Sequence, residues 1–492
     1  ASILNLYYAE REGGLWVTTC ALPLARALGL ALSPDGVREF VARGAVIAPS
    51  TMFDGLQRVS IGEHVRYDGT FRRGRHWSAY QSPAEYRSIE GAAEKAAAMA
   101  ADRIERFASV GGQMVVDLTG GLDSRLLAGA ADFAGLHPEV TVNGPPGLED
   151  VRIALQVAAA AGWPMHHFET PLVWTEEITA EMRRELTYRT GGESPFTEIY
   201  HHRITRPTLA GSFRLHAIGI GGEFLRYHPW GQEFMGIGRR RLANVGNVLR
   251  YRLLEGPPPK DLFRNTGYDL LVAGLRDRVR AVCLEEPESL TTQQLDAVHI
   301  WRMTGHSSFY LSSVWNWLPS VAPLLTAGFL ETGVAMPWRM RLTGRLQRGT
   351  IERLCPRAAR VPTQYGGTGG RMRASDVPLE LWQLAKRSGH LMSKLDQVLL
   401  GGRGARVLCL PEPAGKGTIP YLTREFRDFL RPKALRSREL YDPEGLRGLL
   451  GGTDPEWLAR ETWILRLATI EQLCAELDCR PDADLLSGRG SP

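Results

Sequence analysis

The sequence predicts an α/β protein in which a doubly wound parallel sheet follows a small β-rich part and precedes a mainly helical one. Three observations carry this prediction: short apolar runs between turn residues over 1–80, alternating strand and helix patterns over 114–168, and helical periodicity from about 290 to 480. A chain of 492 residues is too long for one ordinary core. We therefore expect a β-rich domain over 1–80 and a second domain over 81–492.

The first 80 residues have the pattern of short strands with one helix among them. Apolar runs such as 15–17 are separated by Gly, Pro and Asp, as in strands joined by turns. A helix is expected over 34–43, with Ser33 as its N-cap. An alanine-rich stretch with helical periodicity follows over 82–108, so we place the domain boundary near residue 80.

Strand and helix patterns then alternate along the chain. The predicted order is a strand at 114–118, a loop at 119–124, a helix at 125–133, a strand at 140–142, a helix at 148–161 and a strand at 165–168. This alternation is the basis of the predicted parallel sheet, because parallel strands need a long connection that is usually a helix.

Composition excludes several classes of protein. The net charge is +5, but the 59 basic residues are dispersed and only six are lysine, which argues against nucleic-acid binding. The sequence has no run of 18 apolar residues and no secretory signal pattern, so we expect neither a membrane span nor export. Six scattered cysteines without a C-x-x-C pair argue against a zinc ribbon and favour a cytoplasmic protein.

The strongest local signal is the octet at 118–125, Leu-Thr-Gly-Gly-Leu-Asp-Ser-Arg. A strand ends there, two glycines allow close backbone approach, and a helix begins at once. Backbone N–H groups, with the hydroxyls of Thr119 and Ser124, predict a nest for a polyphosphate, and Asp123 is placed to hold Mg²⁺ against it. The structural alternative is an ordinary Gly-Gly turn with an aspartate at the helix start. A Walker A loop is excluded, because no Gly-Lys-Ser/Thr follows.

The octet resembles the pyrophosphate loop of the asparagine synthetase family, which includes β-lactam synthetases and lasso-peptide cyclases. Thr119 keeps the hydroxyl of the usual first serine, whereas Arg125 replaces a common second serine. Members of that family activate a carboxylate with ATP as an acyl-adenylate, release pyrophosphate and pass the acyl group to an amine.

Further segments extend the resemblance over most of the chain. Residues 50–62 resemble the segment that joins the two domains of the family, and the strand at 140–143 lies where the family's second strand runs beside adenine. Glu149 and Asp150 resemble an acidic pair at the start of the next helix. Residues 217–224 resemble the second family loop, with Glu223 at its aspartate position.

The resemblance implies a set of ligand-binding residues. Glu223 would join Asp123 as a magnesium ligand. The expected ATP-binding residues are Leu118, Thr119, Gly120, Gly121, Asp123, Ser124, Arg125, Val142, Asn143, Gly221 and Gly222.

The departures from the family pattern also carry predictions. The first domain, 1–80, is too short for the family's glutamine-hydrolysing domain, so we expect a truncated, non-catalytic remnant in which Cys20, inside a strand, is a core thiol. Ile220 stands where family members carry a Glu or Tyr that contributes to base catalysis. The family's catalytic lysine is missing from the glycine-rich stretch at 360–371, so Lys416 or Arg371 is expected to supply that cation.

The resemblance therefore implies an AMP-forming carbon–nitrogen ligase that uses ATP and Mg²⁺ but not glutamine. Its substrate would carry a carboxylate and an amine, and intramolecular closure, as in lactam or lasso-peptide formation in antibiotic biosynthesis, is favoured because tethering raises the effective concentration of the amine. Partner biosynthetic proteins are possible, whereas nucleic acid and membrane are not expected. The alternatives are a ligase that joins two molecules or uses free ammonia, a non-catalytic ATP-binding scaffold, and a tRNA-modifying pyrophosphatase, which the dispersed charge disfavours.

Overall fold

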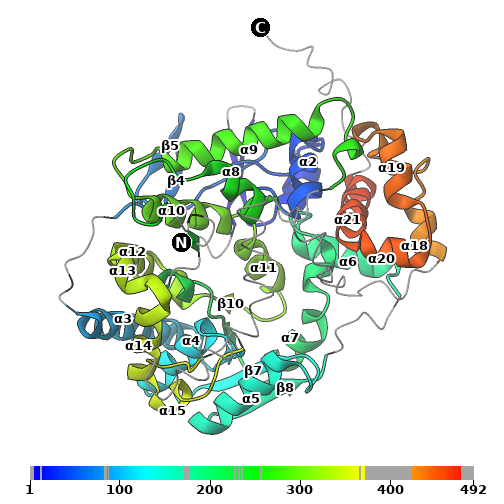
Figure 1. Ribbon diagram of the computed structural model, residues 1–492. Coiled ribbons are helices and arrows are strands. Elements are labelled where there is room, and N and C mark those ends of the chain that lie inside the picture. The colour runs from blue at the N-terminus through cyan, green and yellow to red at the C-terminus, as the bar shows by residue number, and fades with distance from the viewer. Residues whose placement is uncertain are drawn as a thin grey trace, which may run out of the picture.

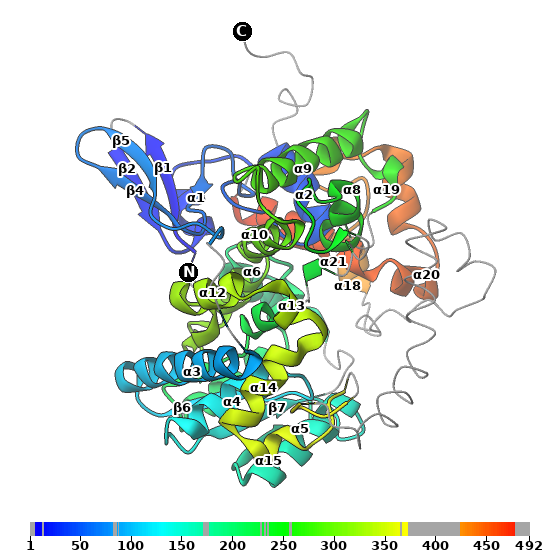
Figure 2. The ribbon, with the colours of Figure 1, turned by 60° about the vertical axis from the view of Figure 1, so that its left-hand side comes forward.

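The structure is a computed structural model with an α/β fold, built on a five-stranded parallel sheet with small antiparallel sheets beside it. It describes residues 5–11, 14–81, 86, 88–170, 177–226, 229–230, 233, 236–254, 258–364, 367–371 and 424–477. Figures 1 and 2 show the parallel sheet with its helices at one end of the molecule and a mainly helical part at the other.

The parallel sheet has the strand order β10-β9-β6-β7-β8. Its strands are β6 (Met114–Asp117), β7 (Glu139–Asn143), β8 (Met165–Phe168), β9 (Leu215–Ala217) and β10 (Ser320–Val321). The chain therefore runs outward from β6 to β8 and then returns to the other side of β6 for β9 and β10. The parallel sheet and its first three strands are confirmed, because buried runs joined by helices can pair only in this way.

Alternate residues of β6 face the two sides of this sheet, as the pleat requires. Val116 and Leu118 pack into the cluster of helices on one face, whereas Val115 packs on the other face against Leu209 and Phe213. The helices of the first face are α3 (Ile89–Gly111), α4 (Asp123–Phe133), α5 (Glu149–Ala161), α14 (Arg345–Leu354) and α15 (Pro356–Ala359). The other face is covered by α7 (His202–Ala210) and, beside β10, by α11 (Ser307–Val314).

The predicted helix starts differ from the structure at two places. The helix expected over 82–108 is α3, which begins at Ile89 after Ser88, whose side chain accepts a hydrogen bond from Gly91 N at 3.1 Å. The predicted start at 82–85 lies outside the described residues. The helix expected at 125–133 begins two residues earlier, because Asp123 already has helical geometry.

The amino-terminal part is β-rich, as predicted, but contains two helices. Its elements are β1 (Tyr7–Arg11), β2 (Gly14–Thr18), α1 (Ala21–Ala27), α2 (Pro34–Arg43), β3 (Gln57–Arg58), β4 (Glu63–Tyr67) and β5 (Phe71–Arg75). Helix α2 and its cap are confirmed, since Ser33 Oγ accepts from Gly36 N at 3.2 Å. The strand predicted around Cys20 is wrong: Cys20 follows β2 and precedes α1, in which Ala21, Leu22 and Leu24 are buried.

The remaining helices form the other end of the molecule and the layer between (Figures 1 and 2). They are α6 (Ala180–Thr190), α8 (Val245–Val248), α9 (Gly267–Cys283), α10 (Thr291–Met303), α12 (Ala327–Ala335), α13 (Trp338–Arg341), α18 (Arg424–Phe429), α19 (Pro443–Leu450), α20 (Asp454–Ala459) and α21 (Glu461–Leu477). The buried residues of α1 and α2 belong to the same hydrophobic cluster as those of α6 and α18–α21.

Glu193 is a carboxyl group that is fully buried beside that shared core. Its Oε1 accepts a hydrogen bond from Met52 N at 3.1 Å, and its Oε2 has no hydrogen-bond partner among the described residues. Burial raises the pKa of Glu193 from 4.5 to about 7, although the charge of Arg58 and the Met52 hydrogen bond oppose the shift.

The raised pKa of Glu193 predicts that the free energy of unfolding falls as pH rises. The folded protein holds the proton up to about pH 7, whereas the unfolded chain releases it near 4.5, so the stabilisation is complete below pH 4.5 and is lost as pH rises through 7. Glu193→Gln should exceed the parent by less than about 1 kcal/mol at pH 5 and by about 3 kcal/mol at pH 8 in urea denaturation. The exposed control Glu105→Gln should follow the parent; a Glu193→Gln variant with the parent's pH dependence would contradict the prediction.

Candidate functional site

A cavity of about 470 Å³ opens at the carboxyl ends of β6 and β9. These strands are adjacent in the sheet, but the chain continues from them to opposite sides, so their carboxyl ends mark the switch point of the sheet. The lining residues are Asp117, Thr119, Asp123, Ser124, Ile218, Gly219, Ile220, Glu223, Arg226, His299, Arg302, Met303, His306, Ser307 and Tyr310. Both predicted loops therefore meet at the position where doubly wound sheets bind ligands.

The first loop is organised by its own side chains. Ser124 Oγ accepts a hydrogen bond from Thr119 N at 2.9 Å and lies 2.9 Å from Thr119 Oγ1. Gly120 N donates to Asp150 Oδ1 at 2.7 Å, and Gly121 N donates to Thr119 Oγ1 at 3.2 Å. The predicted nest is therefore smaller than expected, because the N–H groups of 119–121 donate within the protein. The donors that remain for an anion are at the start of α4, whose first N–H groups have no partner inside the helix.

The second loop approaches the first so closely that only glycine fits. A Cβ atom at Gly219 would lie 2.6 Å from Ser124 N, and one at Gly222 would lie 2.9 Å from Asp123 Oδ1. Gly221 has φ of 105°, a left-handed conformation that glycine adopts without strain. The buried side chain of Gln347 joins the loops, because its Nε2 donates to Asp123 Oδ1 at 2.5 Å and to the Gly222 carbonyl at 3.1 Å.

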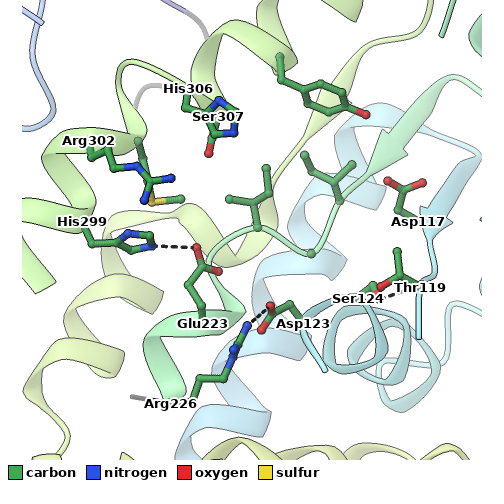
Figure 3. Close-up of a pocket in the computed structure, with 15 residues that line it drawn as sticks. Asp117, Thr119, Asp123, Ser124, Glu223, Arg226, His299, Arg302, His306 and Ser307 are labelled. Carbon is green, nitrogen blue, oxygen red and sulfur yellow. Dashed lines mark hydrogen bonds and ion pairs between the residues drawn. The ribbon is translucent and has the colours of Figure 1, made fainter. Parts of the chain in front are cut away.

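The two predicted metal ligands share the cavity, but each carboxylate has another partner (Figure 3). Arg226 Nη2 donates to Asp123 Oδ2 at 2.7 Å, and His299 Nε2 lies 3.3 Å from Glu223 Oε1. The enclosed position of Asp123 raises its pKa, and the charge of Glu223 adds to this while Arg226 opposes it. Burial acts in the same direction on Glu223, but the hydrogen bond and charge of His299 outweigh it and hold the pKa of Glu223 well below its usual range.

The third wall of the cavity comes from α10 and the start of α11. Figure 3 shows His299, Arg302, His306 and Ser307 along this wall, opposite Asp117. The lining positions 299, 302, 303, 306, 307 and 310 recur at helical spacing, which was the available sequence signal for this wall. Sequence reasoning missed it, because no motif marks these residues.

Asp117 ends β6 on the face covered by α7 and α11. Its Oδ1 lies 3.0 Å from Nε2 of His216, a fully buried residue of β9. Burial favours the neutral carboxyl, but His216 and the charge of Arg206 outweigh it and lower the pKa of Asp117 to about 2. Arg206 also donates to the hydroxyl of Tyr310 at 2.9 Å, so a buried polar network fixes this wall from behind.

Several predicted ligand residues lie outside the cavity lining. Leu118 is fully buried, and Arg125, also fully buried, donates to the carbonyls of Ala358, Val361 and Pro362. The expectation that the Arg125 side chain reaches a ligand is therefore not met in this structure, because its guanidinium is used to hold 358–362. Val142 and Asn143 lie on β7, next to the cavity strand, and the buried Oδ1 of Asn143 has no partner among the described residues.

Of the two predicted cations, the structure describes Arg371, which lies away from the cavity. Arg371 Nη1 lies 2.9 Å from Glu90 Oε1 at the start of α3, and Arg371 does not line the cavity. Lys416 lies outside the described residues. The described cations that line the cavity are Arg226 and Arg302, neither of which the sequence analysis selected.

Comparisons with known proteins do not identify the family of this chain, so the family resemblance stays a prediction from the sequence. No model of a known protein family matches the chain, and a search of curated proteins finds no match. Within the part of the chain that the structure describes, no helix combines the length and the apolar character needed to cross a membrane. In the same residues, no three His, Cys, Asp or Glu side chains gather as a metal site would require.

The close contact of the two loops predicts a steric effect of one methyl group. Gly219→Ala should lower the free energy of unfolding by about 1–3 kcal/mol in urea denaturation, because the added carbon meets main-chain atoms that cannot rotate away. Gly147→Ala is the control, since a Cβ at Gly147 meets no atom within 4 Å. Equal stability of the two variants would mean that the loops are not in contact.

Proposed function

We propose that this protein is an ATP-dependent amide ligase that activates a carboxylate as an acyl-adenylate and transfers it to an amine. The observation that carries the proposal is the convergence of the loops after β6 and β9 on one cavity at the switch point of the sheet. That position suits a nucleotide in any doubly wound fold, and the loop sequences resemble those of the asparagine synthetase family.

The first loop supports phosphate binding at the start of α4. Hydroxyls of Thr119 and Ser124 line the cavity there, and the positive end of a helix dipole favours an anion. The unpartnered Oδ1 of Asn143, at the end of the neighbouring strand, is an acceptor suited to the exocyclic amine of adenine. ATP would then lie across the ends of β6 and β7, with its phosphates toward the second loop.

The rest of the cavity supports a substrate that carries both an amine and a carboxylate. Arg302 on α10 offers a cation, and Asp117 on the opposite wall offers an anion whose pKa is held far below neutrality (Figure 3). Met303, Ile218 and Ile220 give the space between them apolar sides. When one molecule carries both reacting groups into the same cavity, ring closure is favoured over the joining of two molecules.

The nitrogen source in this proposal is the substrate amine rather than glutamine. Cys20 does not line the cavity, and burial raises the pKa of its thiol to about 11, so the thiolate needed for nucleophilic attack is disfavoured. This arrangement supports a structural role for the amino-terminal part, whose strands and helices pack with α6 and α18–α21 in one core.

The chemistry follows from these positions. The substrate carboxylate attacks the α-phosphate of ATP, pyrophosphate leaves, and the amine then attacks the acyl-adenylate and displaces AMP. Residues of α10, α11 and both loops line the cavity in which these groups would react. A non-catalytic ATP-binding scaffold is the rival function, since Ile220 occupies the expected position of a base.

Exchange of labelled pyrophosphate into ATP, run with a panel of candidate carboxylates, separates the ligase from the scaffold. Asp123→Asn should lower exchange by about 10²–10³, because the loss of its negative charge releases Arg226 and Gln347 from the phosphate loop. The control Asp132→Asn removes a carboxylate near the other end of α4 and should exchange like the parent. Parent-like exchange by Asp123→Asn would refute this assignment of the loop.

A further inference from the structure

The carboxylates of Asp123 and Glu223, which the sequence predicts to bind magnesium, already have hydrogen-bond partners within the protein. All four carboxylate oxygens of Asp123 and Glu223 accept hydrogen bonds, from Arg226, Gln347, His299 and Gly221 N. A divalent ion bound to Asp123 would lie against the Arg226 guanidinium, which is 2.7 Å from Oδ2, and like charges at such distances repel. The pair as arranged therefore does not fit the magnesium site that the sequence predicts.

Arg226 lies where such an ion would be expected. It follows the short helix Gly222–Leu225, three residues after Glu223, and its side chain extends to Asp123, the first residue of α4 (Figure 3). The side chain is partly enclosed, with 22% of its surface exposed, so the guanidinium can face both Asp123 and the cavity. A guanidinium group binds phosphate oxygens through two parallel hydrogen bonds. It thereby supplies the positive charge that a metal ion would otherwise bring to the phosphates.

We propose that Arg226 is the residue that binds the polyphosphate of the nucleotide, in place of a metal ion held by Asp123 and Glu223. This inference rests on the proposed phosphate loop, and it also identifies a cation in the cavity where Lys416 and Arg371 were expected to act. Asp123 then has a positioning role: its carboxylate orients the guanidinium toward the helix start, and Gln347 fixes the carboxylate from the other side. In this proposal Asp123 and Glu223 do not act as protein ligands of magnesium.

The test is the binding of inorganic pyrophosphate to the full chain by isothermal titration calorimetry, in EDTA and in excess Mg²⁺. The parent should bind pyrophosphate in EDTA, because its cation is part of the protein. Arg226→Ala should weaken binding roughly ten- to hundredfold, the value of a lost charge-assisted hydrogen bond, and Arg226→Lys should restore part of it.

A matched control keeps the result interpretable. Arg353 on α14 forms an ion pair with Glu94 at 2.9 Å outside the cavity, so Arg353→Ala removes a similar surface pair and should bind like the parent. Thermal unfolding of each variant separates loss of binding from loss of fold, and Arg226→Lys carries the test if Arg226→Ala is unstable.

Three results would overturn the inference: no binding by the parent in either buffer, parent binding only with Mg²⁺, or Arg226 variants no weaker than Arg353→Ala. The proposed reaction is judged separately. If pyrophosphate binding depends on Arg226 but no carboxylate supports exchange, the role of Arg226 stands and the ligase function is refuted. If Arg226→Ala exchanges pyrophosphate like the parent, the ligase function stands and the role of Arg226 is refuted.

Discussion

The contact between the loop after β9 and the start of α4 brings Asp123 and Glu223 into one cavity. Gly219 and Gly222 lie against Ser124 and Asp123 with no room for a side chain. This contact is possible because β9 returns beside β6, so the ends of both strands meet at one edge of the sheet. Gln347 then closes the junction from α14 through two hydrogen bonds, and the paired charges of Asp123 and Arg226 complete it.

Sequence reasoning predicted what depends on local pattern. The parallel sheet and helix α2 follow from periodicity and capping, and both loops were found because glycines and carboxylates at strand ends leave a recognisable pattern. Helix α1 was missed because a short buried helix and a buried strand have similar apolar runs. Its buried side chains were therefore assigned to the wrong element.

The third wall could not be predicted, because its position depends on packing between distant segments. Residues of α10 and α11 reach the cavity only through the arrangement of those helices over the ends of β6 and β9. The contacts of Arg125 could not be predicted for the same reason: its octet is local, but the carbonyls that its guanidinium contacts lie more than 230 positions later. Charged residues in a motif are assigned correctly only when their distant partners are known.

The shared core of the two ends of the chain has a consequence for biosynthesis. Arg466 of α21 donates to the Val41 carbonyl of α2 across 425 positions, and the apolar residues of α1 and α2 pack with those of α18–α21. Helices α1 and α2 therefore have no complete packing partner until α18–α21 have been synthesised. Contacts at such separation slow folding and leave apolar surface exposed meanwhile, which is the condition under which nascent chains depend on chaperones.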